Sequence, residues 1–244
     1  MVAVCATFYL FQQPTSGQAI DKPLVVGTSA DYPPYAQIDL ATGEIVGFEI
    51  DIMHEIARRL DKKIIIKDMP FTSLIIELMS GQIDLIAAGL SPTPERKKAV
   101  LFSYPYIDND QLLIMSKKNS SPITNLADLY GKTVAVNTGY TSDTFLSKIP
   151  EISLIRLKSP ADGFMALQTD SVDAFAIVQS SFDIFYKKQQ ADEYQIFEIP
   201  ASADSCALAY EKNNKILQDD IDPIIKAMIK DKTVLALQKK WGLA

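Results

Sequence analysis

The chain has 244 residues, of which 48% are hydrophobic and 22% charged, and its formal net charge at pH 7 is −6. This composition is typical of a globular protein with a sizeable core, and the length allows one large domain or two lobes. Lysines and arginines are scattered along the chain, so we expect no nucleic-acid partner. The single histidine, His54, excludes most catalytic triads and zinc sites, and we expect no metal and no cofactor.

Residues 1–20 are interpreted as a signal-peptide remnant or linker that does not belong to the fold. A mostly apolar run comes first, and Gly17 and Ala19 fit the small-x-small pattern that precedes a signal-peptidase cut. A lipid attached to Cys5 is the alternative. No apolar run approaches the roughly 20 residues of a membrane span. The other cysteine, Cys206, is far from Cys5, and we expect a small buried residue there rather than a disulfide.

The first half of the chain predicts alternating strands and helices. Short β-branched or apolar runs indicate strands at residues 24–28, 63–67 and 83–88. Apolar residues at helical spacing indicate helices at residues 48–60 and 71–80. In residues 29–35, two prolines exclude both a helix and ladder pairing. The order β-α-β-α-β predicts right-handed crossovers and a largely parallel sheet.

The third strand leads into a helix start that suits an anion. The strand ends at Gly89, and Ser91 is a suitable N-cap for a helix whose first turn contains two prolines and Glu95. Free N–H groups, the Ser91 hydroxyl and the Arg96 guanidinium together suit a carboxylate or a phosphate. We therefore predict a small ligand that carries an anionic group.

The second half of the chain repeats this organisation. Strands are predicted at residues 112–115, 133–136, 152–157, 172–178 and 206–210. Helices are predicted from about residue 143, at 161–169 and 180–190, and twice within 216–241. One strand again ends at a polar, glycine-bearing loop, residues 137–143, where Asn137 either contacts a ligand or forms the turn.

Ligands of open parallel sheets bind outside the carboxyl ends of the strands. Two such ends that face each other predict one site between two lobes. The segment after about residue 203 is expected to return to the first lobe. Lobe 1 is therefore expected to comprise residues 21–111 and 207–244, and lobe 2 residues 112–206.

One series of motifs runs along most of the chain: Gly47-Phe48-Glu49-Ile50-Asp51-Ile52, Ser91-x-Thr93-x-x-Arg96, Phe102-Ser103-x-Pro105-Tyr106 and Gly131-Lys132-x-Val134-Ala135-Val136. This series resembles family 3 of the bacterial extracellular solute-binding proteins, the polar amino-acid receptors of ABC importers. The resemblance implies an α/β fold of the type II periplasmic-binding-protein kind. Its two lobes would be joined by two hinge strands, near residues 109–115 and 203–209, and would close around the ligand.

The resemblance also implies roles for single residues around the ligand's amino-acid head. Arg96 would clamp the α-carboxylate, with the Ser91 hydroxyl and Thr141 beside it. The Gly89 carbonyl would accept a hydrogen bond from the α-ammonium. The alternative for Arg96 is an ordinary surface arginine on a helix.

Two aromatic residues, Tyr32 and Phe71, match positions that sandwich the ligand side chain, although plain core aromatics are the alternative. Stacking over a cation would contribute roughly 0.5–2 kcal/mol per face. Asp31 is a candidate partner for a cationic side chain, or else a solvated loop acid. Ala88, Thr138 and Ser142 adjoin the matched positions and complete the predicted set.

Two positions depart from the family pattern. The family often has an acid at the position of Ser29, which in binders of basic amino acids reaches the cationic end of the ligand. It usually has an aspartate at the position of Val178, where the carboxylate pairs with the α-ammonium. A buried ammonium without an anionic partner is costly. Three alternatives follow: Gln179 and backbone carbonyls replace the acid, the alignment shifts locally, or the ligand is not an ordinary α-amino acid.

These observations predict a monomeric, non-enzymatic binding protein in the periplasm or another extracytoplasmic space. Its partners would be a free polar amino acid, with arginine or another basic one first and glutamine next, and an ABC permease in the inner membrane. An alternative is a cyclohexadienyl-dehydratase-like enzyme on the same fold. It would need an acid catalyst in the cleft, where the sequence places no acid clearly. A sensory domain is a third alternative, but no signalling segment is visible.

Overall fold

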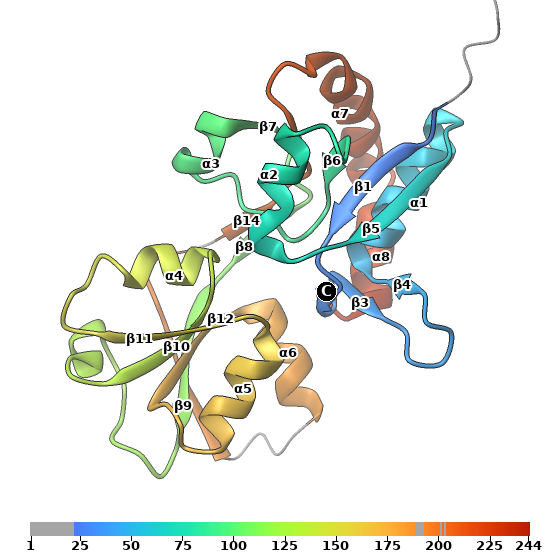
Figure 1. Ribbon diagram of the computed structural model, residues 1–244. Coiled ribbons are helices and arrows are strands. Elements are labelled where there is room, and N and C mark those ends of the chain that lie inside the picture. The colour runs from blue at the N-terminus through green and yellow to red at the C-terminus, as the bar shows by residue number, and fades with distance from the viewer. Residues whose placement is uncertain (1–21, 189–192, 201, 203) are drawn as a thin grey trace, which may run out of the picture.

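The protein folds into two α/β lobes (Figure 1). The computed structural model describes residues 22–188, 193–200, 202 and 204–244. The signal-peptide prediction for residues 1–20, and Cys5 with it, lies outside the described residues. Each lobe contains a five-stranded sheet, and a pair of short strands lies between the lobes. The predicted two-lobed α/β fold class is confirmed.

The sheet of the first lobe has the strand order β5-β1-β6-β15-β7. Its strands are β1 Leu24–Thr28, β5 Ile64–Asp68, β6 Leu85–Ile86, β7 Val100–Phe102 and β15 Ala209–Glu211. β1 is parallel to β5 and β6, whereas β15 runs antiparallel to β6 and β7. Because β1 and β6 are parallel, their carboxyl ends lie at the same edge, where Ser29 and Gly89 follow.

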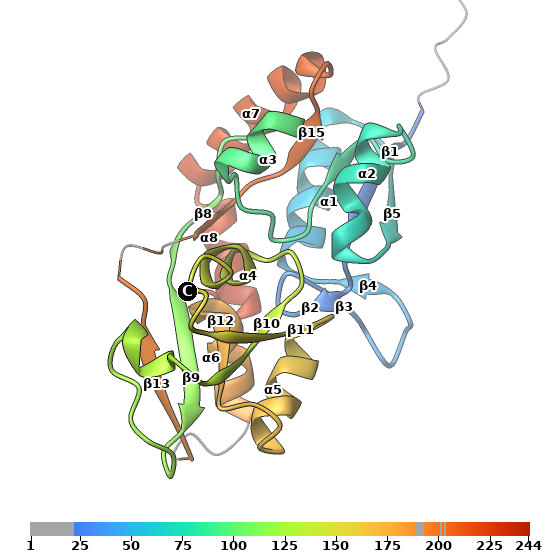
Figure 2. The ribbon, with the colours of Figure 1, turned by 60° about the vertical axis from the view of Figure 1, so that its left-hand side comes forward.

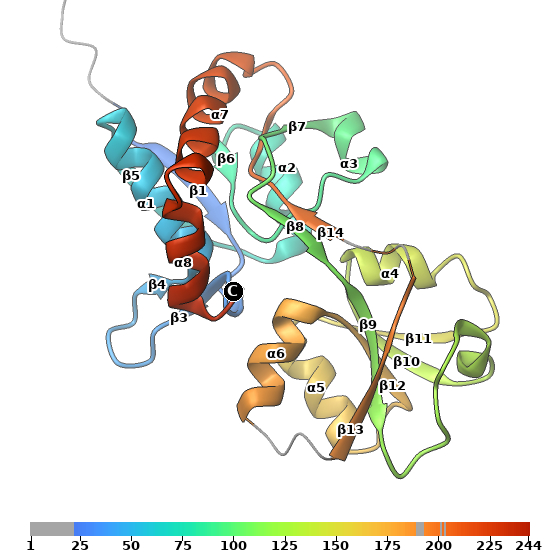
Figure 3. The same ribbon diagram turned by 180° about the vertical axis from the view of Figure 1, so that it is seen from behind.

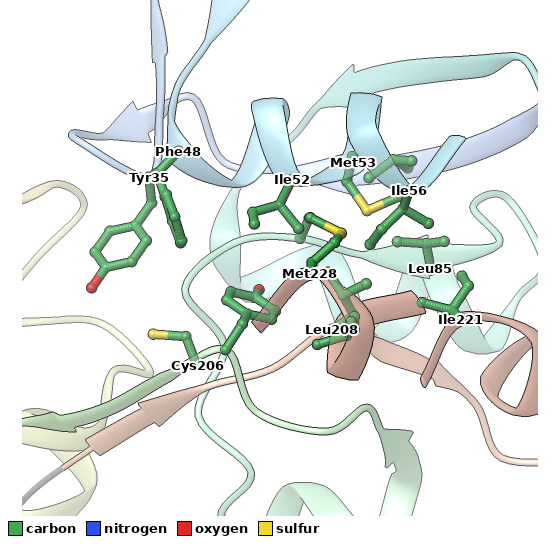
Figure 4. Packing of buried hydrophobic residues seen from close by; sticks show 14 of the residues in the cluster. Tyr35, Phe48, Ile52, Met53, Ile56, Leu85, Cys206, Leu208, Ile221 and Met228 are labelled. Atoms are coloured by element: carbon green, nitrogen blue, oxygen red, sulfur yellow. The ribbon is translucent and has the colours of Figure 1, made fainter. Parts of the chain in front are cut away.

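Amphipathic helices cover this sheet. They are α1 Phe48–Leu60, α2 Leu74–Met79, α3 Pro94–Ala99, α7 Lys215–Lys230 and α8 Thr233–Trp241, and the 3-10 turn η1 Phe71–Ser73 precedes α2. Figure 4 shows Ile52 and Ile56 of α1 in the same core as Leu85, Ile221 and Met228. Each such buried side chain contributes about 1.5–3 kcal/mol. His54 lies on the exposed face of α1, as its place in the helical pattern predicts.

A small antiparallel sheet leads from β1 to α1. It consists of β2 Asp31–Tyr32, β3 Ala36–Ile38 and β4 Ile45–Val46. The prediction that residues 29–35 form no ladder is therefore wrong, since Tyr32 pairs with Ala36. A proline lacks only its own N–H group and favours an extended conformation in the residue before it, so Asp31 and Tyr32, which precede the prolines, can still pair in a ladder. Pro33 and Pro34 form the turn between the two strands.

The sheet of the second lobe has the strand order β11-β10-β12-β9-β13. Its strands are β9 Leu112–Lys117, β10 Thr133–Asn137, β11 Ser153–Leu157, β12 Ala174–Val178 and β13 Tyr194–Glu198. Its helices are η2 Leu126–Leu129, α4 Thr141–Leu146, α5 Pro160–Gln168 and α6 Gln179–Lys188. β10 is parallel to β11 and β12, so Asn137 and Val178 end their strands at the same edge. In the turned view α5 lies below β2, and the two elements are in contact (Figure 2).

Two short antiparallel strands, β8 Ile107–Asp110 and β14 Asp204–Cys206, lie between the lobes (Figure 3). Asp204 is opposite Asp110 in this pair. After β14 the chain enters the first sheet as β15 and ends with α7 and α8. Cys206 is buried, as predicted, beside the first-lobe core (Figure 4). None of the helices in the described ranges is both long and apolar enough to cross a membrane.

Candidate functional site

A pocket with an empty volume of about 420 Å³ lies between the lobes, and we call it the inner pocket. The first lobe contributes Tyr32, Phe71, Gly89, Ser91 and Arg96 to its lining. The second lobe contributes Asn137, Tyr140, Thr141, Ser142, Pro160, Ala176, Ile177, Val178 and Ser181. Asp204 of β14 completes the lining. The pocket thus lies where the two strand–loop–helix segments meet, at the carboxyl ends of parallel strands.

The helix that carries Arg96 begins at Pro94, with Thr93 as its N-cap. The Thr93 hydroxyl accepts a hydrogen bond from the Arg96 backbone N at 3.2 Å. The prediction that Ser91 caps this helix is therefore wrong. With Ser91 as the cap, Thr93 would need a helical conformation directly before Pro94, and a following proline disfavours that conformation.

The Arg96 guanidinium connects the two lobes. Its Nη1 donates to the Ser91 carbonyl and its Nη2 to the Gly139 carbonyl of the second lobe, both at 2.9 Å. Its central carbon lies 5.5 Å from the centroid of the Phe71 ring, within the range of a cation–π interaction. A guanidinium has five N–H donors, so donors beyond these two bonds remain for a ligand carboxylate.

Three aromatic rings meet at the inner pocket. The Tyr140 ring, from the second lobe, has its centroid 4.5 Å from that of Phe71 and 5.4 Å from that of Tyr32. The resemblance implied that Tyr32 and Phe71 enclose the ligand side chain. Here Tyr140 contacts both rings, so a ligand side chain that enters this space meets aromatic surfaces from both lobes.

The Gly89 loop is held by a buried glutamate of α1. Gly89 has φ +60°, and its N donates to Glu49 Oε2 at 2.6 Å. The Tyr106 hydroxyl donates to the other oxygen of this carboxylate. Burial raises the pKa of Glu49 to about 7. A Cβ on Gly89 would lie 2.5 Å from the Tyr32 ring, so only glycine lets the loop pass this close.

Glu49 is expected to make the protein less stable as the pH rises from 5 to 8. Its pKa is about 7 in the fold, whereas the ordinary pKa of a glutamate is 4.5, so the folded state binds more protons between these values. Stability is therefore highest below pH 4.5 for this group and falls as the pH rises through 7. The change is on the order of 3 kcal/mol, at about 1.4 kcal/mol per pKa unit.

Urea unfolding at pH 5 and pH 8 checks this expectation. Glu49→Gln should remove most of the pH dependence. Glu55→Gln on the same helix should leave it in place, because the pKa of Glu55 is lowered to about 2. Equal pH slopes in the wild type and Glu49→Gln would contradict the assignment.

The carboxylate of the inner pocket comes from β14. Val178 lines the pocket with an apolar side chain, whereas Asp204 accepts hydrogen bonds from the hydroxyls of Thr141 and Ser91. Burial raises the pKa of Asp204, and these hydrogen bonds lower it. The sequence placed no acid clearly in the cleft, but the pairing of β14 with β8 brings Asp204 there.

Several buried polar atoms of the second lobe have no hydrogen-bond partner in the described part of the chain. Among them are Asn137 Nδ2 and the Tyr140 hydroxyl, and both residues line the inner pocket. Asn137 is only 2% exposed. Because buried polar groups are nearly always hydrogen-bonded, this wall suits a polar ligand.

A second hollow adjoins the inner pocket at Phe71, and we call it the outer groove. Its empty volume is about 1180 Å³, and its lining consists of Ser29, Ala30, Asp31, Ile38, Asp68, Met69, Pro70, Phe71, Thr72, Thr138 and Lys158. Asp31 accepts from Ser29 Oγ at 2.7 Å, and Asp68 accepts from the Ala30 N at 2.8 Å. Burial raises the pKa of Tyr140, and the negative charge of Asp31 raises it further.

Comparison with known proteins identifies the family. Residues 24–244 match the model of the bacterial extracellular solute-binding proteins, family 3. The chain belongs to this family. The resemblance seen in the sequence is thereby confirmed.

Individual relatives of this solute-binding protein match along nearly their whole length. The chain is 34% identical to the arginine-binding extracellular protein ArtP of Bacillus subtilis, over 99% of this chain and 95% of that protein. It is 38% identical to a crystallised substrate-binding protein of an amino acid ABC transporter, with a TM-score of 0.82 over 90% of this chain and 99% of the other. An ancestral arginine-binding protein bound to arginine is 33% identical, with a TM-score of 0.83 over 90% and 97% of the two chains. An ancestral arginine-binding protein bound to glutamine is also 33% identical, with a TM-score of 0.82 over 90% and 97% of the two chains.

The structure of this solute-binding protein brings most of the predicted site residues together. The inner pocket contains Tyr32, Phe71, Gly89, Ser91, Arg96, Asn137, Thr141, Ser142 and Val178, and the outer groove contains Ser29, Asp31 and Thr138. Ala88 and Gln179 line neither. Ala88 is buried in the first-lobe core, and Gln179 Nε2 donates to Asp183 at 2.7 Å.

Sequence reasoning missed Tyr140 and Asp204. Tyr140 directly follows Gly139 in a loop already predicted to face the cleft, so its place in that loop was an available signal. Asp204 lies in the predicted hinge segment, where an acid at the start of a strand does not by itself indicate a binding site. Only the pairing of β14 with β8 shows that this carboxylate lies between the lobes.

Proposed function

We propose that this solute-binding protein captures arginine, or another basic amino acid, between its lobes and delivers it to an ABC permease. It would act by binding rather than catalysis, as a monomer outside the cytoplasmic membrane. The lobes would meet at residues 111/112 and 206/207. The observation that carries the proposal is the pair of hollows that adjoin at Phe71, with Arg96 in the inner pocket and two carboxylates, Asp31 and Asp68, in the outer groove.

The inner pocket suits an α-carboxylate. Arg96 lies on the first lobe and reaches the Gly139 carbonyl of the second, and Asn137 offers an unpaired amide. Charge-assisted hydrogen bonds from a guanidinium are stronger than neutral ones and can be bidentate. A carboxylate held here would contact both lobes.

The outer groove suits a cationic side chain. A ligand side chain that extends from the inner pocket toward the outer groove would pass Phe71 and Tyr140 and approach Asp31 and Asp68. Aromatic faces and carboxylates both attract a guanidinium. The name of the Bacillus subtilis relative and the arginine in the ancestral structure support the same ligand. Ser29, at a position where the family often has an acid, and the glutamine-bound ancestral structure favour glutamine as the alternative.

Closure follows from contacts to both lobes. A ligand that contacts both lobes only in the closed arrangement shifts the population toward that arrangement. Contacts between the lobes already exist here, such as the hydrogen bond from the Tyr35 hydroxyl to Ser180 Oγ at 3.0 Å. The permease would then distinguish the closed form from the open one.

Calorimetry on protein freed of co-purified ligand by unfolding and refolding tests the proposal. Arginine, lysine, histidine and glutamine would be titrated separately, and arginine should bind most tightly. At about 100 times Kd, arginine should add about 2.7 kcal/mol to the stability. Glutamine as the tightest ligand would favour the alternative. The absence of binding heat with every amino acid would contradict the proposal. Because Asp204 supplies an acid to the cleft, prephenate is included, and its consumption would favour the dehydratase-like alternative.

Replacing Asp31 by asparagine is expected to weaken arginine binding about fivefold, because Asp31 is exposed and its attraction is screened by solvent. Glutamine binding should stay the same, since its amide carries no charge. Asp219→Asn removes the same charge from the exposed side of α7 and should change neither affinity. Equal losses for arginine and glutamine in Asp31→Asn would show that the residue acts on the fold instead.

A further inference from the structure

Asp204 is a carboxylate of the inner pocket that makes no direct contact with a basic side chain among the described residues. It is partly buried, and none of the ion pairs found within the described ranges includes it, although the charge of Arg96 attracts it through the pocket. Its hydrogen-bond donors are the hydroxyls of Thr141 and Ser91, which are uncharged. Because a carboxylate withdrawn from water without a cation in direct contact is costly, the pocket favours a positive group at this place.

A second acid beside Asp204 also favours a positive group in the pocket. Asp110 is opposite Asp204 in the β8–β14 pair, and like charges directly opposite each other destabilise such a pair. Asp110 is already well bonded, because it accepts from the Ser180 N at 2.9 Å, from Ser180 Oγ at 2.6 Å and from the Tyr35 hydroxyl at 3.0 Å. Asp204, which faces the pocket, is therefore the acid of the two that is available to an incoming cation.

The guanidinium of Arg96 and the carboxylate of Asp204 share one neighbour, Ser91. Ser91 lies between Arg96 and Asp204, since its carbonyl accepts from Arg96 Nη1 at 2.9 Å and its hydroxyl bonds to Asp204. An α-amino acid carries its carboxylate and its ammonium on one carbon. A guanidinium and a carboxylate on either side of one serine suit these two groups.

We propose that Asp204 of β14 is the counter-charge of the ligand's α-ammonium group. This role rests on the proposed function, because it requires an α-amino acid as the ligand. Val178 offers only an apolar side chain to the pocket, and the side chain of Gln179 is bonded to Asp183. The ammonium is thus recognised from a strand between the lobes and not from the second-lobe strand β12.

A comparison of two ligands in two variants tests this role. Arginine and 5-guanidinopentanoate, which is arginine without its α-amino group, would be titrated into the wild type and into Asp204→Asn. The wild type should prefer arginine by roughly 100-fold, within the range of buried charge pairs. Asp204→Asn should lose most of that preference by weakening arginine binding, while 5-guanidinopentanoate binds as before.

Matched variants separate this role from other effects of a lost charge. Asp31→Asn acts at the guanidinium end and should weaken both ligands equally. Asp108→Asn, an exposed acid on β8, should weaken neither. The double variant Val178→Asp/Asp204→Asn places a carboxylate on β12 in place of the one on β14, and it should again prefer arginine. A regained preference would also show that the Asp204→Asn substitution does not act by disturbing the fold.

The other possible results distinguish a wrong role for Asp204 from a wrong proposed function. Equal binding of both ligands by the wild type, or an unchanged preference in Asp204→Asn, would overturn the role of Asp204 while leaving amino-acid binding intact. If glutamine is the tightest ligand, glutamine and glutaramate replace the pair and the same preferences are expected. A wild type that binds no amino acid at all would instead overturn the proposed function, and the role of Asp204 with it.

Discussion

Replacing Arg96 by alanine should weaken the binding of arginine, and of any other amino acid, on the order of 1000-fold. Loss of one partner of a buried, hydrogen-bonded charge pair costs about 2–5 kcal/mol, and about 1.4 kcal/mol is a factor of ten in Kd. Two effects add here. The ligand carboxylate loses its guanidinium, and the closed arrangement loses the bond from Arg96 to the Gly139 carbonyl of the second lobe.

Calorimetry of three variants measures this effect. Arg96→Lys keeps the charge but loses the planar fork of donors, so an intermediate loss is expected. Arg58→Ala removes an exposed arginine on α1 that pairs with Glu55, and it should bind arginine like the wild type. An affinity of Arg96→Ala within about threefold of the wild type would show that the carboxylate is held elsewhere.

Gly47→Ala should destabilise the fold by about 3 kcal/mol or more. Gly47 has φ +151° and ψ 172°, a region that only glycine adopts readily. An added Cβ would lie 2.1 Å from the Tyr35 carbonyl oxygen, the same oxygen that accepts from the Glu49 N at 3.0 Å. The substitution therefore strains the backbone and separates α1 from the segment that carries Tyr35.

Urea unfolding measures this loss against Gly43→Ala. Gly43 also has a positive φ, +74°, but nothing lies within 4 Å of an added Cβ there. Its replacement should cost about 1 kcal/mol from backbone strain alone. Similar losses in the two variants would mean that the close approach at Tyr35 relaxes at little cost. Because Tyr35 bonds to Asp110 and Ser180, arginine binding should also weaken in Gly47→Ala.

Local patterns were enough to predict most elements. Residues 24–28 and 48–60 are strand β1 and helix α1 with the predicted bounds, because apolar periodicity reports which face of an element is buried. Positions at which two local rules compete were harder to predict. Ser91 and Thr93 are both good caps, and the proline after Thr93 decided between them. Residues 31 and 32 pair in a ladder although prolines follow them.

The order of the residues was enough to predict the alternation of strands and helices, the family, and the strand ends at Gly89 and Asn137. These depend on neighbours along the chain, whose spacing is visible in the residue order. The three-dimensional arrangement was needed to show that Asp204 enters the pocket, that Gln179 bonds to Asp183, and that Tyr140 lies against Phe71 and Tyr32. Each of these depends on how distant segments pair or pack, and no local periodicity records such contacts.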